Sequence, residues 1–197
     1  MDPEIVEAAL WALRDDKSRT VESAQGDVFI HVHNPPLRLI IVGAVHIAQP
    51  LAAMAVLTGY AVTVIDPRQA FASEERFDGV AVSNEWPDKA MRALEPDERT
   101  AIVTLTHDPK LDDPALDVAL RAPVFYIGSL GSRRTHGKRR DRLAKLGFND
   151  AAFVRIHGPI GLDIGALTPA EIAVSIMAEI TEVRRRGLAP AANLTGS

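Results

Sequence analysis

An α/β protein with a doubly wound, mostly parallel β-sheet is the fold class that the sequence predicts. Two observations carry this prediction: short continuous apolar runs recur along the chain, and helical stretches separate them. An unbroken run such as Leu39–Val42 is typical of a strand that is covered on both faces. The 197 residues, 47% hydrophobic and 24% charged, have globular composition and suffice for one substantial domain. Strands that alternate with helices form a parallel, Rossmann-like sheet.

Residues 1–37 are predicted to form a short N-terminal arm of one helix and one strand. Apolar residues recur every four positions over residues 4–14, as in an amphipathic helix. A strand over residues 27–33 ends before the Pro35-Pro36 pair. Because about 37 residues are too few for an independent domain, we interpret this arm as a remnant of an inter-domain segment.

Residues 38–187 are predicted to form the Rossmann-like domain. Each strand is a short apolar run; Gly43 follows the first run and Asp66-Pro67 closes the second, and Gly59 ends the first helix as a C-cap. The predicted strands are 39–42, 61–65, 79–82, 101–106, 124–127 and 153–156. The predicted helices between them are 46–58, 88–94, 112–121 and 133–146.

The last helix has the clearest boundaries. Thr168 and Glu171 form a capping box around Pro169, and Gly187 follows the helix. An apolar stripe along one face favours a homodimer, and it consists of Ile172, Ile176, Ile180 and Val183. Residues 188–197 are rich in Ala, Pro and Gly and are expected to form a flexible tail.

The composition excludes several classes of function. The sequence has no cysteine, so thiolate metal sites, cysteine nucleophiles and persulfide carriers are all excluded for this chain. A net charge of −4 and 5% aromatic residues argue against nucleic acid as a partner. No apolar run approaches the roughly 18 residues of a membrane span, and the acidic start lacks a signal-peptide core. We therefore expect a cytoplasmic protein without a membrane partner.

In a doubly wound sheet, ligands bind beyond the carboxyl ends of the strands, so the loops there are the candidate sites. The first such loop contains Gly43, Ala44 and His46. Asp66 follows 23 residues after Gly43, which is close to the distance from a dinucleotide-binding glycine loop to the acidic residue that binds the ribose. Val45, however, replaces the second glycine of a dinucleotide fingerprint. The loop could equally be a plain strand-to-helix turn that needs one glycine.

Asp66 and Arg68 together could hold a ligand. The carboxylate of Asp66 would bind a diol or a ring N–H, and the guanidinium of Arg68 would bind a phosphate. A salt-bridged turn is the alternative interpretation of this pair.

The segment Gly128–Arg134 is the most promising loop. Its two glycines, two serines and two arginines follow a buried strand and open a helix, where backbone N–H groups, hydroxyls and guanidinium groups converge on one point. This arrangement favours phosphate or another oxyanion. Residues 133–142 carry six cations, and the distal ones could instead form a solvated face: Arg133, Arg134, Lys138, Arg139, Arg140 and Arg142.

Two further loops are candidates. Thr106-His107-Asp108 closes a strand, and its His–Asp pair could perform acid–base work or could simply cap a helix. The segment Gly158–Gly165, in which Asp163 is the only charged residue, could cover a ligand or be a rigid connection. His31 and His33 share a strand face, but two ligands do not make a metal site.

Six segments, taken together and in order, resemble the Rossmann domain of the XdhC/CoxI family, the accessory factors of xanthine dehydrogenase and carbon monoxide dehydrogenase. The resemblance covers about residues 37–187. The Gly128–Arg134 and Pro159–Gly165 segments are the specific ones, and Val45 departs from the glycine common in the family. The matching segments are Leu39–His46, Val64–Arg68, Thr106–Asp108, Tyr126–Arg134, Pro159–Gly165 and Thr168–Ile180.

The resemblance implies a maturation role. Family members are thought to bind molybdenum cofactor (molybdopterin), protect it during sulfuration, and deliver it to a molybdenum hydroxylase of the xanthine dehydrogenase or CO dehydrogenase type. The implied partners are the large subunit of that hydroxylase, a cysteine desulfurase, and a separately encoded protein with the family's amino-terminal domain. The implied cofactor-binding residues are Gly43, Ala44, His46, Asp66, Arg68, Thr106, His107, Asp108, Gly128, Ser129, Gly131, Ser132, Arg133, Arg134, Pro159, Gly161 and Asp163.

We accordingly expect a cofactor-binding chaperone with no catalytic residues rather than an enzyme. An NAD(P)-binding oxidoreductase of unknown substrate is the alternative, because the first strand–helix–strand unit and Asp66 suit a dinucleotide. A nucleic-acid-binding module that uses the basic helix is a third hypothesis, against which the overall acidity argues.

Overall fold

The computed structural model describes residues 2–24 and 26–187. These residues form two compact units. The smaller unit contains the chain up to Pro35 together with the residues from Arg184 on, and the larger unit spans Pro36–Val183.

The smaller unit contains one helix and one β-hairpin. Helix α1 (Pro3–Asp15) begins where the carboxylate of Asp2 accepts a hydrogen bond from the backbone N–H of Glu4 at 3.0 Å. Strands β1 (Arg19–Val21) and β2 (Val28–Ile30) pair in antiparallel register. The helix agrees with the predicted one, and β2 is shorter than the predicted strand. β1 was not predicted, because three residues are too short for a visible alternation.

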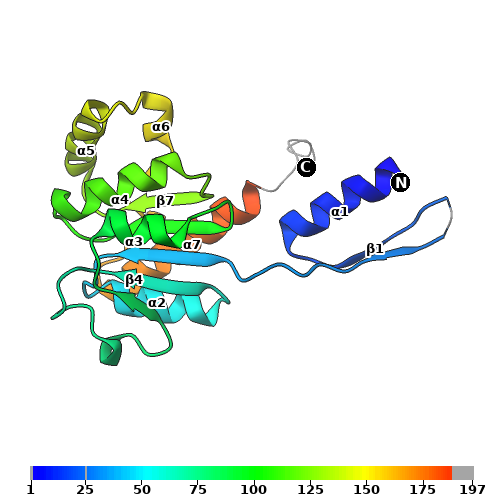
Figure 1. Cartoon of the computed structure of the whole chain (residues 1–197), viewed down its shortest axis with the longest axis horizontal. Helices are drawn as coiled ribbons and strands as arrows, with labels where there is room; N and C mark the ends of the chain where they lie inside the picture. The colour runs from blue at the N-terminus through cyan, green and yellow to red at the C-terminus, as the bar shows by residue number, and fades with distance from the viewer. Residues whose placement is uncertain (1, 25, 188–197) are drawn as a thin grey trace. The chain divides into compact units, whose positions relative to one another are not determined.

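The larger unit is built on a six-stranded parallel sheet (Figure 1), which confirms the predicted fold class. The strand order is β5-β4-β3-β6-β7-β8. Apolar runs form the four central strands, whose residues are mostly buried because helices cover both faces. The strands are β3 (Arg38–Val42), β4 (Ala61–Ile65), β5 (Ala81–Ser83), β6 (Thr100–Thr104), β7 (Tyr126–Ser129) and β8 (Ile156–His157).

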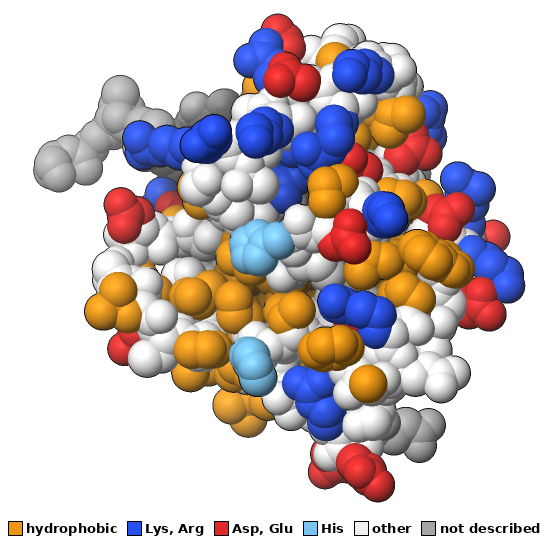
Figure 2. Space-filling view, turned by 90° about the vertical axis from the view of Figure 1, so that its left-hand side faces the viewer, with side chains coloured by type: hydrophobic (Ala, Val, Ile, Leu, Met, Phe, Trp, Pro, Cys, Tyr) orange, Lys and Arg blue, Asp and Glu red, His pale blue; other side chains and the backbone are white. Residues whose placement is uncertain are grey.

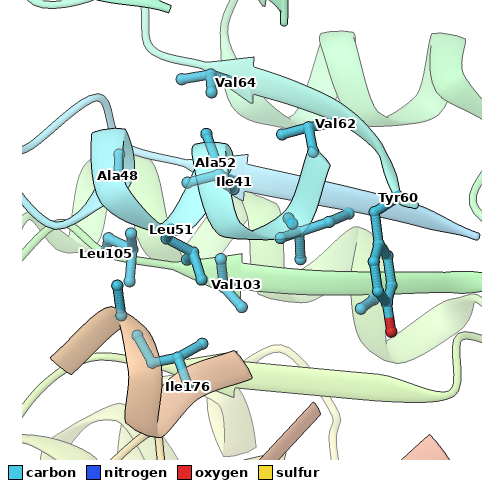
Figure 3. Packing of buried hydrophobic residues seen from close by; sticks show 14 of the residues in the cluster. Ile41, Ala48, Leu51, Ala52, Tyr60, Val62, Val64, Val103, Leu105 and Ile176 are labelled. Carbon is cyan, nitrogen blue, oxygen red and sulfur yellow. The ribbon is translucent and has the colours of Figure 1, made fainter. Parts of the chain in front are cut away.

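Helices pack on the two faces of this sheet and bury two apolar clusters. Alternate residues of β3 point to opposite faces, so that Leu39 and Ile41 belong to one cluster and Ile40 and Val42 to the other. Helices α2 (Ala48–Leu57) and α7 (Pro169–Arg186) cover the first face. Figure 3 shows Leu51 of α2 close to Val103 and Leu105, with Ile176 of α7 beside them.

The opposite face is covered mainly by α3 (Pro87–Leu94) and α4 (Pro109–Arg121), and Leu143 of α5 (Arg133–Lys145) joins the same cluster. The capping box of α7 forms as predicted: the backbone N–H of Thr168 donates to Glu171 Oε2 at 2.8 Å, and the backbone N–H of Glu171 donates to Thr168 Oγ1 at 3.3 Å. Outside these helices, η1 (Glu74–Arg76) is a single 3₁₀ turn.

The predicted strand over residues 153–156 is wrong in its first half. Residues Asp150–Val154 form a short helix, α6, because Asn149 caps it by accepting a hydrogen bond from Ala152 N at 2.9 Å. Strand β8 therefore contains only Ile156 and His157. The predicted strand over 124–127 is also displaced, since β7 runs to Ser129 and takes two residues from the predicted loop.

The apolar stripe of the last helix is buried within the larger unit. Ile176 and Ile180 are fully buried, and Ile172 and Val183 pack against the same cluster. The stripe is therefore not a free surface and no longer supports a homodimer, which stays an untested prediction. The predicted tail over 188–197 lies outside the described residues. Among the described helices, none is both long enough and apolar enough to cross a lipid bilayer.

Candidate functional site

The predicted loops meet at the carboxyl edge of the parallel sheet. β3 lies at the centre and pairs with β4 on one side and β6 on the other, which is the point where strand order reverses and where such sheets bind ligands. Figure 2 shows the face at this edge: Lys and Arg side chains gather over its upper part, and hydrophobic side chains lie across its middle.

Gly43 allows the loops after β3 and β6 to pack closely against each other. Its φ of +105° is in the region that favours glycine, and a Cβ atom there would lie only 2.4 Å from Cγ2 of Thr106. The loops after β3 and β6 therefore touch at backbone level. His46 lies on the same loop with an exposed side chain.

Replacing Gly43 with alanine is expected to lower the free energy of unfolding by at least about 2 kcal/mol, because strained φ and the clash with Thr106 add together. Gly137→Ala is the matched control. Gly137 is helical with open space around its Cα, so alanine there should stabilise by about 0.5–1 kcal/mol. Urea denaturation followed by circular dichroism measures both changes, and equal stability of the Gly43→Ala variant and the parent would contradict the prediction.

Asp66 and Arg68 form an ion pair, in which Asp66 is buried and Arg68 is exposed, rather than two separate ligand groups. Asp66 is fully buried, and its Oδ2 accepts hydrogen bonds from Ala44 N at 2.9 Å and from Arg68 Nη2 at 2.7 Å. Its Oδ1 accepts from Arg68 Nε at 2.8 Å. Burial alone would raise the pKa of Asp66, but the hydrogen bonds from Arg68 and Ala44 outweigh it and lower that pKa. Both carboxylate oxygens of Asp66 therefore already accept hydrogen bonds, and the bond from Ala44 links the loop after β4 to the loop after β3.

The Thr106–Asp108 loop orders the start of α4. Thr106 Oγ1 donates to Oδ1 of the buried Asp112 at 2.6 Å, and Oδ1 of Asp108 caps α4 by accepting from Lys110 N at 2.9 Å. His107 is exposed at the edge. The structure therefore does not pair His107 with Asp108, whose carboxylate serves as the helix cap.

The Gly128–Arg134 segment divides into a buried half and an exposed half. Ser129 is fully buried in β7, and its hydroxyl bonds to that of Thr104 at 2.5 Å. Ser132 is the N-cap of α5 and accepts a hydrogen bond from Thr135 N at 3.2 Å. Arg133 and Arg134 are exposed on the first turn. Gly128 lies against Ile160, so this segment is in contact with the Pro159–Gly165 loop.

The six cations of α5 have different environments. The sequence left open whether the distal cations form a solvated face. Lys138 is exposed, as on such a face, whereas Arg139 is only 1% exposed. Arg142 pairs with Asp113, with Nη2 and Oδ1 at 2.9 Å, and Arg140 pairs with Asp150 at 2.6 Å. A pocket of about 250 Å³ lies between the start of α4 and α5, and it is lined by His107, Pro109, Asp112, Arg134, Thr135, Lys138, Arg139 and Arg142.

Glu179 on α7 is a central residue that sequence reasoning did not identify as part of the site. Its Oε2 accepts hydrogen bonds from Gly161 N at 2.8 Å and from the hydroxyl of Tyr126, and Oε1 lies 3.1 Å from Nδ1 of His157. The ring of His157 stacks on Tyr126 at 4.8 Å. Burial tends to raise the pKa of Glu179, but the bonds with His157, Tyr126 and Gly161 lower it below its ordinary value.

This carboxylate positions the Gly158–Gly165 loop at the carboxyl edge. Burial, together with the neighbouring charge of Glu179, raises the pKa of Tyr126, which stays a neutral donor. Pro159 and Asp163 are exposed on the loop. A sequence signal for Glu179 did exist, because it sits between Ile176 and Ile180 at the border of an otherwise apolar helix face.

No metal centre is formed in the described part of the chain, where no three His, Cys, Asp or Glu side chains cluster. The rings of His31 and His33 are in contact at a tilt of 50°, with centroids 4.1 Å apart. The candidate ligand groups at the carboxyl edge are therefore cations, hydroxyls and backbone N–H groups.

The strand order defines a Rossmann-type domain, and the polar loops at one edge of its sheet form the candidate site. Comparison with known proteins identifies its family: the model of the XdhC Rossmann domain matches residues 39–180. The chain belongs to that family.

Several curated proteins are similar to this chain. The uncharacterized protein YqeB of Escherichia coli K12 is 30% identical over 93% of the chain. The molybdenum cofactor insertion chaperone PaoD of the same organism is 33% identical over 76% of it, and a probable subunit of xanthine dehydrogenase from Bacillus subtilis is 33% identical over 81%. The chain covers 37%, 41% and 47% of these proteins respectively, less than half the length of each.

A crystal structure described as a xanthine dehydrogenase from Bacillus halodurans has a similar fold. It superposes with a TM-score of 0.70 at 28% identity, and covers 84% of this chain and 47% of its own.

Proposed function

We propose that this chain binds molybdenum cofactor at the carboxyl edge of its sheet and serves in the maturation of a molybdenum hydroxylase. The observation that carries the proposal is that the family-matching loops lie together at this edge, beside a cationic pocket that His107 and Arg134 of two of those loops help to line. The names of two relatives, a molybdenum cofactor insertion chaperone and a xanthine dehydrogenase subunit, support the same role.

The donor groups at this edge suit the chemistry of that cofactor. A pterin with a terminal phosphate and an oxyanionic metal centre needs cations, N–H donors and hydroxyls around it. Arg133 and Arg134 open α5, Arg134 lines the pocket together with His107, and Arg139 carries a buried Nε that lacks a hydrogen-bond partner. The cofactor supplies the redox-active metal that the client enzyme uses, whereas these side chains would hold its anionic groups.

Sulfuration would depend on a partner. The sequence contains no cysteine, so no residue of this chain can carry a persulfide or ligate molybdenum through a thiolate. We therefore propose a cysteine desulfurase as the sulfur donor and the large subunit of a molybdenum hydroxylase as the recipient. A separately encoded protein with the family's amino-terminal domain, a homodimeric assembly and a cytoplasmic location belong to the same proposal.

The geometry favours this cofactor over NAD(P) as the ligand. A dinucleotide in the usual pose needs a free carboxylate for its ribose, whereas both oxygens of Asp66 already accept hydrogen bonds from Ala44 and Arg68. Val45 also stands in place of the second glycine that a pyrophosphate would approach.

An anaerobic equilibrium titration with molybdenum cofactor tests the proposal, with NADH and a cytidine nucleotide as competitors. We expect binding that neither nucleotide displaces and that Arg133→Gln weakens by about tenfold, the loss of one charge-assisted hydrogen bond. Arg140→Gln is the control, because Arg140 lies on the same helix but pairs with Asp150. Binding of NADH alone, or an Arg133→Gln variant that binds the cofactor as tightly as the parent, would overturn the proposal.

A further inference from the structure

The pocket between α4 and α5 carries an excess of positive charge. Arg134, Lys138 and Arg142 recur at every fourth position of α5 and therefore lie on one face of that helix. Arg142 is neutralised by Asp113, but neither Arg134 nor Lys138 has an ion-pair partner among the described residues. Like charges four residues apart repel each other and destabilise a helix. An anion between them would remove that repulsion.

The base of the pocket contains a buried guanidinium with an unsatisfied donor. Arg139 is 1% exposed; its Nη2 donates to Leu130 O at 2.9 Å and lies 3.6 Å from Oδ2 of Asp112. Its Nε is buried and has no hydrogen-bond partner. A buried guanidinium N–H without a protein acceptor is uncommon in folded proteins, and a bound water or anion is one of its common explanations.

The size of the pocket limits the ligand group that it can take. A volume of about 250 Å³ corresponds to roughly eight water molecules at about 30 Å³ each. It is below the range of about 300–1,000 Å³ that is typical for whole drug-sized ligands. The pocket is therefore large enough for one phosphate group and the methylene next to it, and too small for a whole drug-sized ligand.

We propose that this pocket is a phosphate subsite, in which Lys138, Arg134 and the buried Arg139 hold the terminal phosphate monoester of the bound ligand. The identity of that ligand as molybdenum cofactor rests on the proposed function, whereas the preference for a phosphate dianion rests on the pocket alone. Lys138 and Arg139, for which a solvated helix face was one of two interpretations from the sequence, thereby become binding residues.

Asp112 is the one carboxylate in the pocket, and burial raises its pKa to about 7. Near neutral pH it is therefore only partly ionised and opposes an anion less than an exposed aspartate would. Its surroundings also include Arg139, Asp113 and Asp108, which shift the same equilibrium.

Inorganic phosphate is the probe for this subsite, titrated at constant ionic strength and followed by calorimetry and by the thermal unfolding midpoint. We expect phosphate to bind and to raise the midpoint, and Lys138→Gln to weaken binding about tenfold through the loss of a charge-assisted contact. Lys145→Gln is the matched control, since Lys145 is an exposed cation of the same helix outside this pocket. Both side chains are exposed, so neither replacement is expected to unfold the protein.

Two results would overturn the inference: no phosphate binding to the parent, or equal weakening by Lys138→Gln and Lys145→Gln, which would indicate general attraction by the basic helix. Competition separates this inference from the proposed function. Cofactor binding that saturating phosphate leaves unchanged refutes the subsite and leaves the proposed function intact. Phosphate binding that depends on Lys138, in a protein that does not bind the cofactor, supports the subsite and refutes the proposed ligand.

Discussion

Arg139→Met is expected to lower the free energy of unfolding by about 3–5 kcal/mol at about pH 8, the cost typical of removing one partner from a buried ion pair. Both side chains of the Arg139–Asp112 pair are at most 3% exposed, so solvent screens their interaction little. Removal of the guanidinium would leave the carboxylate of Asp112 without its compensating charge. Leu130 O would also lose the hydrogen bond that Arg139 donates.

The effect of this replacement should depend on pH in a definite direction. Burial raises the pKa of Asp112 from 3.8 to about 7, so the folded protein holds a proton that the unfolded chain releases between these values. Stability contributed through this group therefore falls as pH rises through that window, and the fall is complete above the folded pKa. Without Arg139 the pKa of Asp112 would rise further, so the variant keeps losing stability above about pH 7 while the parent does not.

Chemical denaturation at about pH 6 and about pH 8 measures this difference. Arg140→Met is the control, because the Arg140–Asp150 pair is exposed and its loss should cost at most about 1 kcal/mol. The double variant Asp112→Asn/Arg139→Met, which keeps an oxygen for Thr106, should recover much of the stability lost in Arg139→Met. A loss that is the same at both pH values would contradict the electrostatic explanation.

Glu179→Ala is expected to destabilise the protein by about 2–5 kcal/mol, because it leaves the buried hydroxyl of Tyr126 and the backbone N–H of Gly161 without an acceptor. His157 would lose its partner at the same time. Glu179→Gln keeps one acceptor oxygen and should cost less. Val174→Ala, at an exposed position of the same helix, is the control and should change stability by only about 0.5 kcal/mol.

The pH dependence of this second site has the opposite sign. The pKa of Glu179 is lowered below its ordinary value of 4.5, so its contribution to stability is present above that value and is lost as pH falls through the folded pKa. The parent should therefore lose stability on acidification below about pH 4.5, and Glu179→Gln should lose less, since it has no carboxylate to protonate. Acid titration of the two proteins, followed by circular dichroism, distinguishes these outcomes, and parallel titration curves would contradict the assignment.

Local sequence patterns were sufficient to predict the parallel sheet and the loops at its carboxyl edge. Unbroken apolar runs specify parallel strands covered on both faces, and strand–helix alternation then fixes which ends carry the loops. The Thr168–Glu171 capping box was predictable for the same reason, since its hydrogen bonds join residues only three positions apart. The short helix α6 was missed, because a five-residue helix that includes Phe153 and Val154 resembles a strand in composition.

The sequence by itself determined the fold class, the family and the edge of the sheet where the candidate site lies. Tertiary structure decided which of the polar residues stay exposed at the candidate site and which are engaged by other parts of the protein. Three polar side chains are engaged within the protein: Asp66 by Arg68, Asp108 by the start of α4, and Ser129 by Thr104. Arg139 is buried and Glu179 is half-buried, and both have partners far away in sequence. Contacts such as Glu179 with Tyr126, 53 residues apart, depend on how the helices pack on the sheet. No local pattern of residues encodes that packing.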